Sequence, residues 1–164
     1  MDRAPGTDGE AKMAKKQAAD APLLLGNQIC FAIYSTAHAF NRVYKPLLDR
    51  LGLTYPQYLV MLALWERDGV PVKDIGERLF LDSGTLTPLL KRLEAAQLIK
   101  RTRNTADERQ VLIALTPQGQ ALKEKARAVP QSILAASACS IAELSAMKND
   151  LVALRERLNE VLEE

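Results

Sequence analysis

The chain has 164 residues, of which 48% are hydrophobic, so it is long and apolar enough for one domain with a buried core, or for one domain with additional helices. No apolar run approaches the roughly 20 residues that a membrane span needs, and the N-terminus lacks the apolar segment of a secretory signal. We therefore expect a cytoplasmic protein with no membrane partner. The formal net charge of +2 indicates no class of partner by itself.

The distribution of charge is more informative than its sum. Residues 91–109 contain six Lys or Arg and three Asp or Glu, whereas residues 140–164 contain six acids and three bases. One basic segment on an otherwise near-neutral chain is typical of a module that reads DNA.

The two cysteines, Cys30 and Cys139, lie far apart in the sequence. They form neither a CxxC pair nor a zinc-binding spacing, so we predict no metal site and no other cofactor. A reducing cytosol disfavours a permanent disulfide between them. Taken alone, they are most simply two small buried hydrophobic residues.

Residues 1–21 are polar, contain scattered Gly and Pro, and show no apolar periodicity, which predicts a disordered or frayed tail. Apolar residues then recur every three or four positions over 23–51 and predict a long helix. We expect Pro46 to kink or break this helix and Gly52 to end it.

Three shorter elements precede the basic segment. A second helix begins at Thr54 or Tyr55 and ends near residue 68. Residues 70–72 predict an extended link or a minimal edge strand, and residues 72–80 predict a third, short helix.

A fourth helix is predicted over residues 83–94, with the side chain of Asp82 or Ser83 accepting hydrogen bonds at its N-terminus. Its leucines recur at helical spacing and predict one apolar stripe, at Leu86, Leu89, Leu90 and Leu93. The opposite face carries hydroxyls and cations, at Thr85, Thr87, Lys91 and Arg92. The pattern alone fits an amphipathic surface helix as well as a helix that binds DNA.

After residue 97 the apolar pattern changes from helical to alternating. Residues 98–103 and 110–115 predict two strands of a β-hairpin, joined by a polar loop over 104–109. Two short helices followed by such a hairpin are typical of a winged helix-turn-helix, in which the second helix enters the major groove and the hairpin is the wing. We assign this DNA-binding domain to residues 53–116.

Further helices follow the DNA-binding domain. One is predicted to begin at Thr116 and Pro117 and to be kinked or ended by Pro130. Ser140 and Glu143 form a capping box for a last helix. The apolar residues of that helix alternate steps of three and four, at Leu144, Met147, Leu151, Leu154, Leu158 and Val161.

This apolar seam has two interpretations, because it either packs on the chain's own core or contacts a second subunit. The DNA-binding domain is already complete when the seam begins, so we favour a helical dimerisation region made of residues 22–52 and 117–164. The predicted fold is therefore mainly α with a small β-hairpin wing: a winged helix-turn-helix plus a helical dimerisation arm. The predicted molecule is a homodimer.

Several segments resemble the MarR family of winged-helix repressors. They are DSGTLT at 82–87, KRLE at 91–94, DER at 107–109 and LTPQG at 115–119. Three further segments resemble the organic hydroperoxide sensors of that family, called OhrR, and they are NQICF at 27–31, YKPLLD at 44–49 and LTYPQY at 53–58. The resemblance extends from about residue 23 to the end of the chain.

The resemblance implies a thiol sensor. Cys30 would be the peroxide-reactive thiolate, with Tyr44 and Tyr55 donating hydrogen bonds to its sulfur. Tyr34, four residues from Cys30 and hence on the same helix face, would line the same pocket. Phenols that donate to a sulfur favour the thiolate, which attacks a peroxide and becomes a sulfenic acid. Cys139 of the partner subunit would be the resolving thiol, as in two-cysteine sensors.

The resemblance also implies a DNA interface. Four residues of the fourth helix would face the major groove, namely Thr85, Thr87, Pro88 and Arg92. Arg109 in the wing would enter the minor groove, with Asp107 holding it in position. Ser83 and Lys91 belong to the same helix and are further candidates. The expected partner is a pseudo-palindromic double-stranded operator.

We therefore predict a dimeric repressor, not an enzyme, which an organic or lipid hydroperoxide releases from DNA. One alternative is a MarR-type repressor that a small aromatic ligand releases, with incidental cysteines. Two others are a thiol peroxidase and an architectural DNA-binding protein without a switch. Replacing Cys30 separates the first two hypotheses, because only a thiol sensor would keep DNA binding and lose its response to peroxide.

Overall fold

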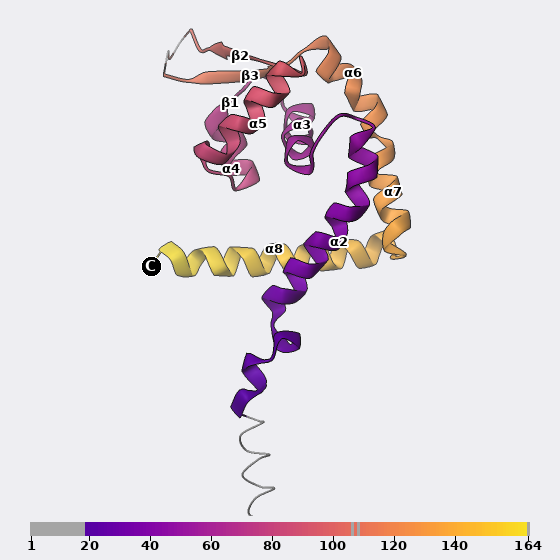
Figure 1. Cartoon of the computed structure of the whole chain (residues 1–164). Helices are drawn as coiled ribbons and strands as arrows, with labels where there is room; N and C mark the ends of the chain where they lie inside the picture. The colour runs from indigo at the N-terminus through magenta and orange to yellow at the C-terminus, as the bar shows by residue number, and fades with distance from the viewer. Residues whose placement is uncertain (1–18, 106, 108, 164) are drawn as a thin grey trace, which may run out of the picture. The chain divides into compact units, whose positions relative to one another are not determined.

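The computed structural model describes residues 19–105, 107 and 109–163 (Figure 1). The chain forms two compact units, which meet in the sequence between Arg42 and Val43 and are described separately. Residues 1–18, most of the tail that we predicted to be disordered, lie outside the described residues.

The first unit contains two short 3-10 helices, η1 (Ala21–Leu23) and η2 (Leu25–Asn27), and the beginning of helix α2 (Ile29–Asp49). The long helix therefore begins at Ile29, and the predicted start at residue 23 is wrong. The Asn27 side chain donates to the carbonyl of Ala21 at 2.8 Å, which ties the two 3-10 helices together. The large apolar side chains of this unit are exposed, namely Leu23, Leu24, Leu25, Ile29, Phe31, Ile33 and Phe40.

Helix α2 continues through Pro46 to Asp49, so the break that we considered at Pro46 does not occur. A proline within a helix removes one main-chain hydrogen bond, to the carbonyl four residues earlier. Leu48 is 1% exposed, and its burial in the core holds the last turn in place. The helix ends at Asp49, and Gly52 closes the turn that follows in the left-handed conformation with φ +67°, the role that we predicted for it.

A helix-turn-helix follows in the second unit. Its elements are α3 (Tyr55–Glu66), the short strand β1 (Val70–Pro71), α4 (Val72–Leu79) and α5 (Ser83–Ala95). The backbone N–H of Thr54 donates to the side chain of Gln57 at 2.8 Å, which satisfies one free donor at the start of α3. Phe80, in the left-handed conformation with φ 55°, ends α4 and reverses the chain toward α5.

The wing consists of β2 (Ile99–Arg103) and β3 (Val111–Leu115), which pair antiparallel with Ile99 opposite Leu115 and Arg103 opposite Val111. Strand β1 pairs with the other edge of β3, so the strand order is β1-β3-β2. The edge strand predicted at residues 70–72 is therefore present. Side chains from the end of α2, from helices α3 to α7 and from the sheet meet in one core.

That core explains why these elements form. Its fully buried members come from both helices and sheet, and burial of each large apolar side chain contributes about 1.5–3 kcal/mol. The largest are Leu48, Val60, Met61, Leu64, Ile75, Leu86, Leu90, Leu93, Ile99 and Ile113.

Three helices follow the wing: α6 (Pro117–Ala126), α7 (Ala128–Ser137) and α8 (Ile141–Glu163). The break between the first two falls at Arg127, and Pro130 lies in the first turn of α7, where its missing N–H costs no helical hydrogen bond. The helix that we predicted to run to about residue 128 therefore ends two residues earlier, at Ala126, and its break lies three residues before Pro130. The capping box is confirmed, because Ser140 N–H donates to Glu143 at 2.8 Å and Glu143 N–H to Ser140 Oγ at 3.2 Å.

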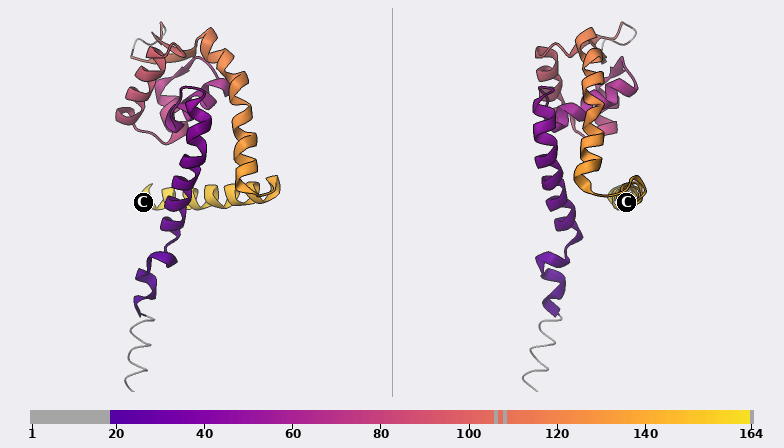
Figure 2. Two further views of the ribbon diagram at one scale, coloured as in Figure 1. Left: turned by 45° about the vertical axis from the view of Figure 1, so that its right-hand side comes forward. Right: turned by 90° about the vertical axis from the view of Figure 1, so that its right-hand side faces the viewer.

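Helices α6 and α7 lead away from the lobe that α3, α4, α5 and the wing form, and α8 turns back beneath this lobe (Figures 1 and 2). Arg155 of α8 lies over the ring of Phe80, 4.4 Å from its centroid. Several apolar side chains of α8 are exposed, namely Ile141, Met147, Leu151, Leu158 and Val161. No helix in the described part of the chain has the length and apolar character to cross a membrane.

The predicted fold class, mainly α with a hairpin wing, is confirmed. The division into residues 53–116 for the DNA-binding domain and residues 22–52 and 117–164 for the dimerisation region stays a prediction.

Gly119 sits where α6 crosses the start of β2, and a Cβ at this position would lie 2.0 Å from the carbonyl oxygen of Leu98. We expect Gly119→Ala to lower the free energy of unfolding by about 1–3 kcal/mol, although alanine favours helix by up to about 1 kcal/mol. Urea denaturation measures the difference. Gly26→Ala, where nothing lies within 4 Å of the new Cβ, is the control. Equal stability of the two variants would contradict the close approach.

Candidate DNA-binding surface and thiol sensor

Asp82 is the N-cap of helix α5. Its Oδ1 accepts the backbone N–H of Thr85 at 2.8 Å, and its Oδ2 accepts the Thr85 hydroxyl at 2.9 Å. Both hydrogen bonds hold the pKa of Asp82 below its usual value, and the bond from the backbone N–H of Thr85 has the larger effect. Of the two N-caps that the sequence left open, Asp82 is the one used, and Ser83 is an exposed residue of the first turn.

The leucine stripe of α5 is buried as predicted, at Leu86, Leu89, Leu90 and Leu93. Because this face is held in the core, the opposite face is fixed toward solvent. Five predicted DNA-binding residues are exposed there, namely Ser83, Thr85, Pro88, Lys91 and Arg92. Thr87 is half-buried.

Both threonine hydroxyls of α5 already donate within the helix. The Thr85 hydroxyl donates to Asp82, and the Thr87 hydroxyl donates to the carbonyl of Ser83 at 2.7 Å. What remains for a partner is the methyl group and an oxygen lone pair of each threonine. These groups suit contacts with thymine methyls and with base amino groups in the major groove.

Glu94 connects the end of α5 to the wing. Its Oε1 accepts the backbone N–H of Arg101 at 3.2 Å, and its Oε2 lies 4.0 Å from the Arg101 guanidinium. Such a partly exposed ion pair contributes about 1 kcal/mol or less. Its structural effect is to fix β2 relative to the last turn of α5.

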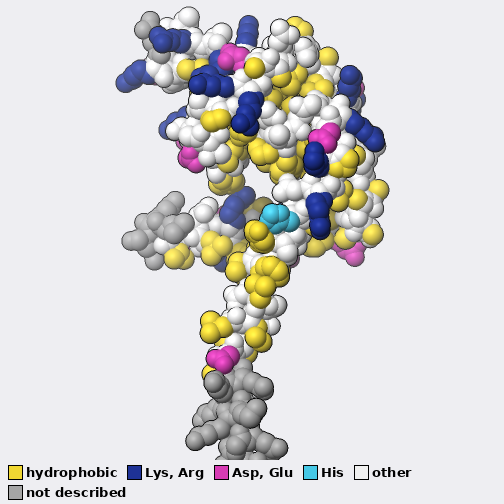
Figure 3. Space-filling model, in the orientation of Figure 1, with side chains coloured by type: hydrophobic (Ala, Val, Ile, Leu, Met, Phe, Trp, Pro, Cys, Tyr) yellow, Lys and Arg dark blue, Asp and Glu magenta, His cyan; other side chains and the backbone are white. Residues whose placement is uncertain are grey.

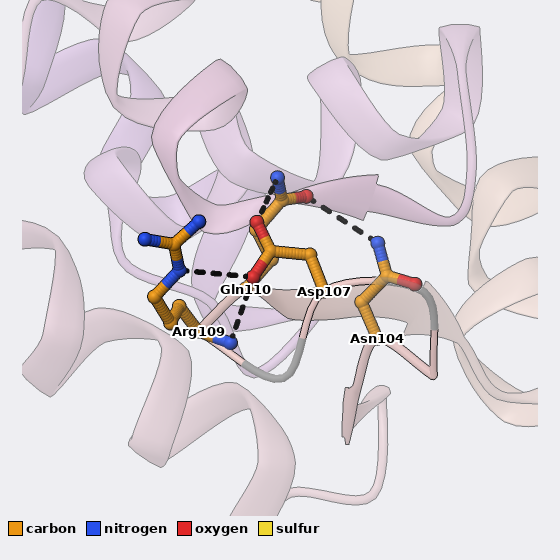
Figure 4. A network of polar contacts seen from close by, with 4 residues as sticks. All are labelled: Asn104, Asp107, Arg109 and Gln110. Carbon is orange, nitrogen blue, oxygen red and sulfur yellow. Dashed lines mark hydrogen bonds and ion pairs between the residues drawn. The ribbon is translucent and has the colours of Figure 1, made fainter.

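A polar network organises the tip of the wing (Figure 4). Asp107 Oδ1 accepts both the backbone N–H and the Nε–H of Arg109, at 3.1 and 3.2 Å. The Arg109 side chain is 92% exposed, and its two terminal nitrogens point away from Asp107 (Figure 4). The arginine is therefore held at its Nε while the rest of its guanidinium faces outward.

The same network includes two residues that the sequence analysis missed. Gln110 donates from Nε2 to Asp107 Oδ2 at 3.1 Å, and Asn104 donates from Nδ2 to Gln110 Oε1 at 3.4 Å. The backbone N–H of Asn104 also donates to the carbonyl of Gln110 at 2.9 Å, closing the hairpin. Amide side chains at both ends of a predicted hairpin loop were the available signal.

Lys and Arg side chains gather over the wing and α5 (Figure 3). The basic segment 91–109 of the sequence spans the end of α5 and the wing. The clustering suits the phosphates that flank a major groove.

Two of the three predicted sensor tyrosines meet within the second unit. The rings of Tyr44 and Tyr55 lie with their centroids 4.7 Å apart, and Tyr58 lies 6.1 Å from Tyr44. Burial, together with the neighbouring phenols Tyr55 and Tyr58, raises the pKa of Tyr44 to about 12. Burial also raises the pKa of Tyr55. Both phenols therefore keep their protons at neutral pH and remain hydrogen-bond donors.

Cys30 lies in the first turn of α2 and is exposed, so the interpretation of this thiol as a buried hydrophobic residue is wrong. Tyr34 lies one helical turn further along, 62% exposed. Its ring meets that of His38 edge-on, with centroids 4.4 Å apart. The first unit thus presents a thiol and a phenol on an open helix face.

Cys139 lies in the turn between α7 and α8, half-buried, and is also a free thiol. Its sulfur donates to the carbonyl of Ser137 at 3.3 Å. The preceding residue, Ala138, has the left-handed conformation with φ 53°, which ends α7. Among the described residues, no group of three His, Cys, Asp or Glu is placed to hold a metal ion.

A winged helix-turn-helix with a capped, polar-faced α5 and an arginine-tipped wing is the architecture of a DNA-binding regulator. The family model of the transcriptional regulators SarA and Rot matches residues 42–126, more than half of the chain. The chain belongs to the MarR family of winged-helix transcriptional regulators. It is accordingly a DNA-binding protein.

Two curated relatives are each 51% identical to this MarR-family chain. One is the transcriptional regulator TtmR of Methylorubrum extorquens, matched over 85% of this chain and 72% of TtmR. The other is the organic hydroperoxide resistance transcriptional regulator of Bacillus subtilis, matched over 83% of this chain and 92% of the relative.

Solved structures of AbfR from Staphylococcus epidermidis are also similar. Reduced AbfR bound to DNA is 39% identical, with a TM-score of 0.70 over 85% of this chain and 96% of AbfR. A disulfide form of AbfR matches with 36% identity and a TM-score of 0.58 over 94% of this chain and 99% of AbfR.

We expect Arg109→Ala to weaken operator binding by this regulator by about 1–3 kcal/mol per wing, because the exposed guanidinium is lost. Asp107→Ala should weaken binding less, since it releases the arginine without removing it. Fluorescence anisotropy with labelled operator DNA measures both. Arg127→Ala, an exposed arginine at the α6–α7 junction, is the control. Unchanged binding by the Arg109 variant would mean that the wing does not contact DNA.

We expect Tyr44 to ionise near pH 12, about two units above an ordinary tyrosine of pKa 10.0. An unfolded Tyr44 would ionise at its ordinary pKa while the folded one keeps its proton, so its stabilising contribution is complete below pH 10 and is lost as the pH rises toward 12. Phenolate absorbance during alkaline titration measures the ionisation. The latest inflection should disappear in Tyr44→Phe, and its persistence there would contradict the assignment.

Proposed function

We propose that this MarR-family regulator is a dimeric repressor that organic or lipid hydroperoxides release from a pseudo-palindromic DNA operator. Cys30 is the sensing thiol, and it forms a disulfide with Cys139 of the partner subunit. The observation that carries the proposal is the 51% identity to an organic hydroperoxide resistance regulator, because the match spans 92% of that relative.

The positions of the thiols support this chemistry. Cys30 is exposed at the start of α2, where a peroxide from solvent reaches its sulfur. Tyr44 and Tyr55 keep their protons and so are able to donate to a thiolate. Phenol donors stabilise the anion relative to the thiol, and the anion is the nucleophile.

The proposed reaction has two balanced steps. The Cys30 thiolate attacks one oxygen of ROOH, the O–O bond breaks, and the alkoxide takes up a proton and leaves as ROH. Sulfur is oxidised by two electrons to sulfenic acid. The thiolate of Cys139 of the partner subunit then attacks this sulfur, a disulfide forms, and hydroxide leaves and is protonated to water. The disulfide form known for AbfR supports the second step.

Exposed apolar residues support the dimer. Helix α8 is 23 residues long, yet none of its described side chains is buried. Leu151, Leu158 and Val161 are 49–71% exposed along one seam. A second subunit that covers this seam and the exposed apolar residues of α2 would remove a large apolar surface from water.

Release from DNA follows from the connection between the sensing region and the wing. Strand β3 leads directly into α6, and α6 leads through α7 and Cys139 into α8. The two α5 helices of a dimer must sit about 34 Å apart to enter successive major grooves. A disulfide that moves the arms therefore changes this spacing and weakens binding.

The test uses two serine variants. Cys30→Ser should bind operator DNA as the wild type does and should stay bound when tert-butyl hydroperoxide is added, because no sulfenic acid forms. Cys139→Ser should still lose the Cys30 thiol to peroxide but should show no dimer-sized band on a non-reducing gel. Anisotropy, thiol titration and the gel are the measurements.

Release of Cys30→Ser from operator DNA by peroxide would contradict the proposal. Release of the wild type by an aromatic carboxylate and not by peroxide would favour the ligand-controlled alternative. More than one equivalent of peroxide consumed per thiol, with an added reductant, would indicate a peroxidase.

A further inference from the structure

Trp65, the single tryptophan of the chain, joins the helix-turn-helix to the arm. Its indole N–H donates to the carbonyl of Gly119 at 2.9 Å. In return, Lys123 Nζ donates to the carbonyl of Trp65 at 3.0 Å. The end of α3 and the first turns of α6 are therefore held together by two hydrogen bonds between partly buried groups.

The first turn of α6 is also held from its other side. The backbone N–H of Thr116 donates to the carbonyl of Leu98 at 3.0 Å, and the Thr116 hydroxyl donates to the carbonyl of Gln97 at 2.6 Å. Gly119 lies directly against the carbonyl of Leu98, where only a glycine fits. With β2 on one side and Trp65 on the other, the direction in which α6 leaves the lobe depends on where Trp65 lies.

A line of aromatic rings leads from Trp65 to the sensor tyrosines. Trp65 meets Tyr58 edge-on with centroids 6.4 Å apart, Tyr58 lies 6.1 Å from Tyr44, and Tyr44 lies 4.7 Å from Tyr55. Tyr58 is 3% exposed, so its ring is enclosed by neighbours. In a close-packed interior a ring does not move without displacing the ring beside it.

Helix α6 has space to respond. An open pocket of about 410 Å³ lies along it, lined by Ala121 and Leu122 of α6, by Leu98, and by Leu51 and Gly52 in the turn after α2. A helix with an open pocket along its flank changes its tilt with less steric resistance than one packed on all sides. The junction at Trp65 therefore holds a helix that is otherwise able to shift.

We propose that Trp65 is a positioning residue that couples the sensor tyrosines to the dimerisation arm. In the dithiol form its bond to Gly119 holds α6 in the direction that suits DNA. In the proposed function Tyr44 and Tyr55 donate to the Cys30 thiolate, and oxidation of Cys30 removes that acceptor. The two tyrosines then shift, Tyr58 and Trp65 follow, and the bond from Trp65 to Gly119 is lost. The proposal rests on the proposed function, because peroxide oxidation of Cys30 supplies the signal.

The single tryptophan makes the first test direct. Addition of tert-butyl hydroperoxide to the full-length protein should change the emission of Trp65, and the change should follow the same dose as DNA release. Cys30→Ser should show no change in emission. Release of DNA by the wild type with unaltered Trp65 emission would overturn the coupling.

Variants supply the second test. Trp65→Phe keeps a ring and removes the N–H, so the DNA affinity of the reduced protein should fall by about fivefold, the effect of one neutral hydrogen bond. The affinity of the oxidised protein should stay unchanged, so the ratio of reduced to oxidised affinity falls by the same factor. A loss of general stability would lower both affinities and leave the ratio unaltered.

Lys123→Met tests the reciprocal bond and should lower the same ratio, whereas Lys123→Arg keeps a donor and the charge and should retain it. The Lys123 variants measure the same coupling whether or not Trp65→Phe folds. Wild-type ratios in both Trp65→Phe and Lys123→Met would overturn the coupling and leave the proposed function intact. A wild-type protein that stays on DNA after peroxide treatment would refute both.

Discussion

The burial of the α5 leucines is the constraint on which the DNA-binding surface depends. Leu86, Leu90 and Leu93 are each 1% exposed or less. A helix that loses this much apolar surface to a core has one allowed rotation about its axis. Lys91 and Arg92 are exposed because the neighbouring leucines, Leu90 and Leu93, point into the core. The chemistry of the interface therefore follows from packing on the opposite face.

The spacing of apolar residues and the helix-capping residues were sufficient to predict the helix-turn-helix and the wing. The leucine stripe of α5, the alternation in β2 and β3, and the capping residues Thr116 and Ser140 each depend on neighbours within a few positions, and each is present in the structure. Local interactions of this kind are readable from sequence because the same residues both signal and make them.

What the sequence could not reveal depends on tertiary packing. The α6–α7 break lies at Arg127, three residues before Pro130. The last turn of α2 contains Pro46 and is anchored by the buried Leu48. The approach of Trp65 to Gly119 joins residues 54 positions apart. The exposure of Cys30 was also hidden, because an apolar helix face has the same period whether it meets its own core or another subunit.

The wing tip illustrates how a loop acquires direction without regular structure. Three hydrogen bonds converge on the carboxylate of Asp107, two of them from Arg109. Immobilising an arginine side chain against a partner normally costs about 1.5–2 kcal/mol of conformational entropy. In the wing, Asp107 already orders part of the Arg109 side chain, so a contact with DNA would cost less conformational entropy. The proposed contact of the wing with DNA would therefore be made by a preorganised side chain, and its strength would depend on electrostatics and fit more than on conformational search.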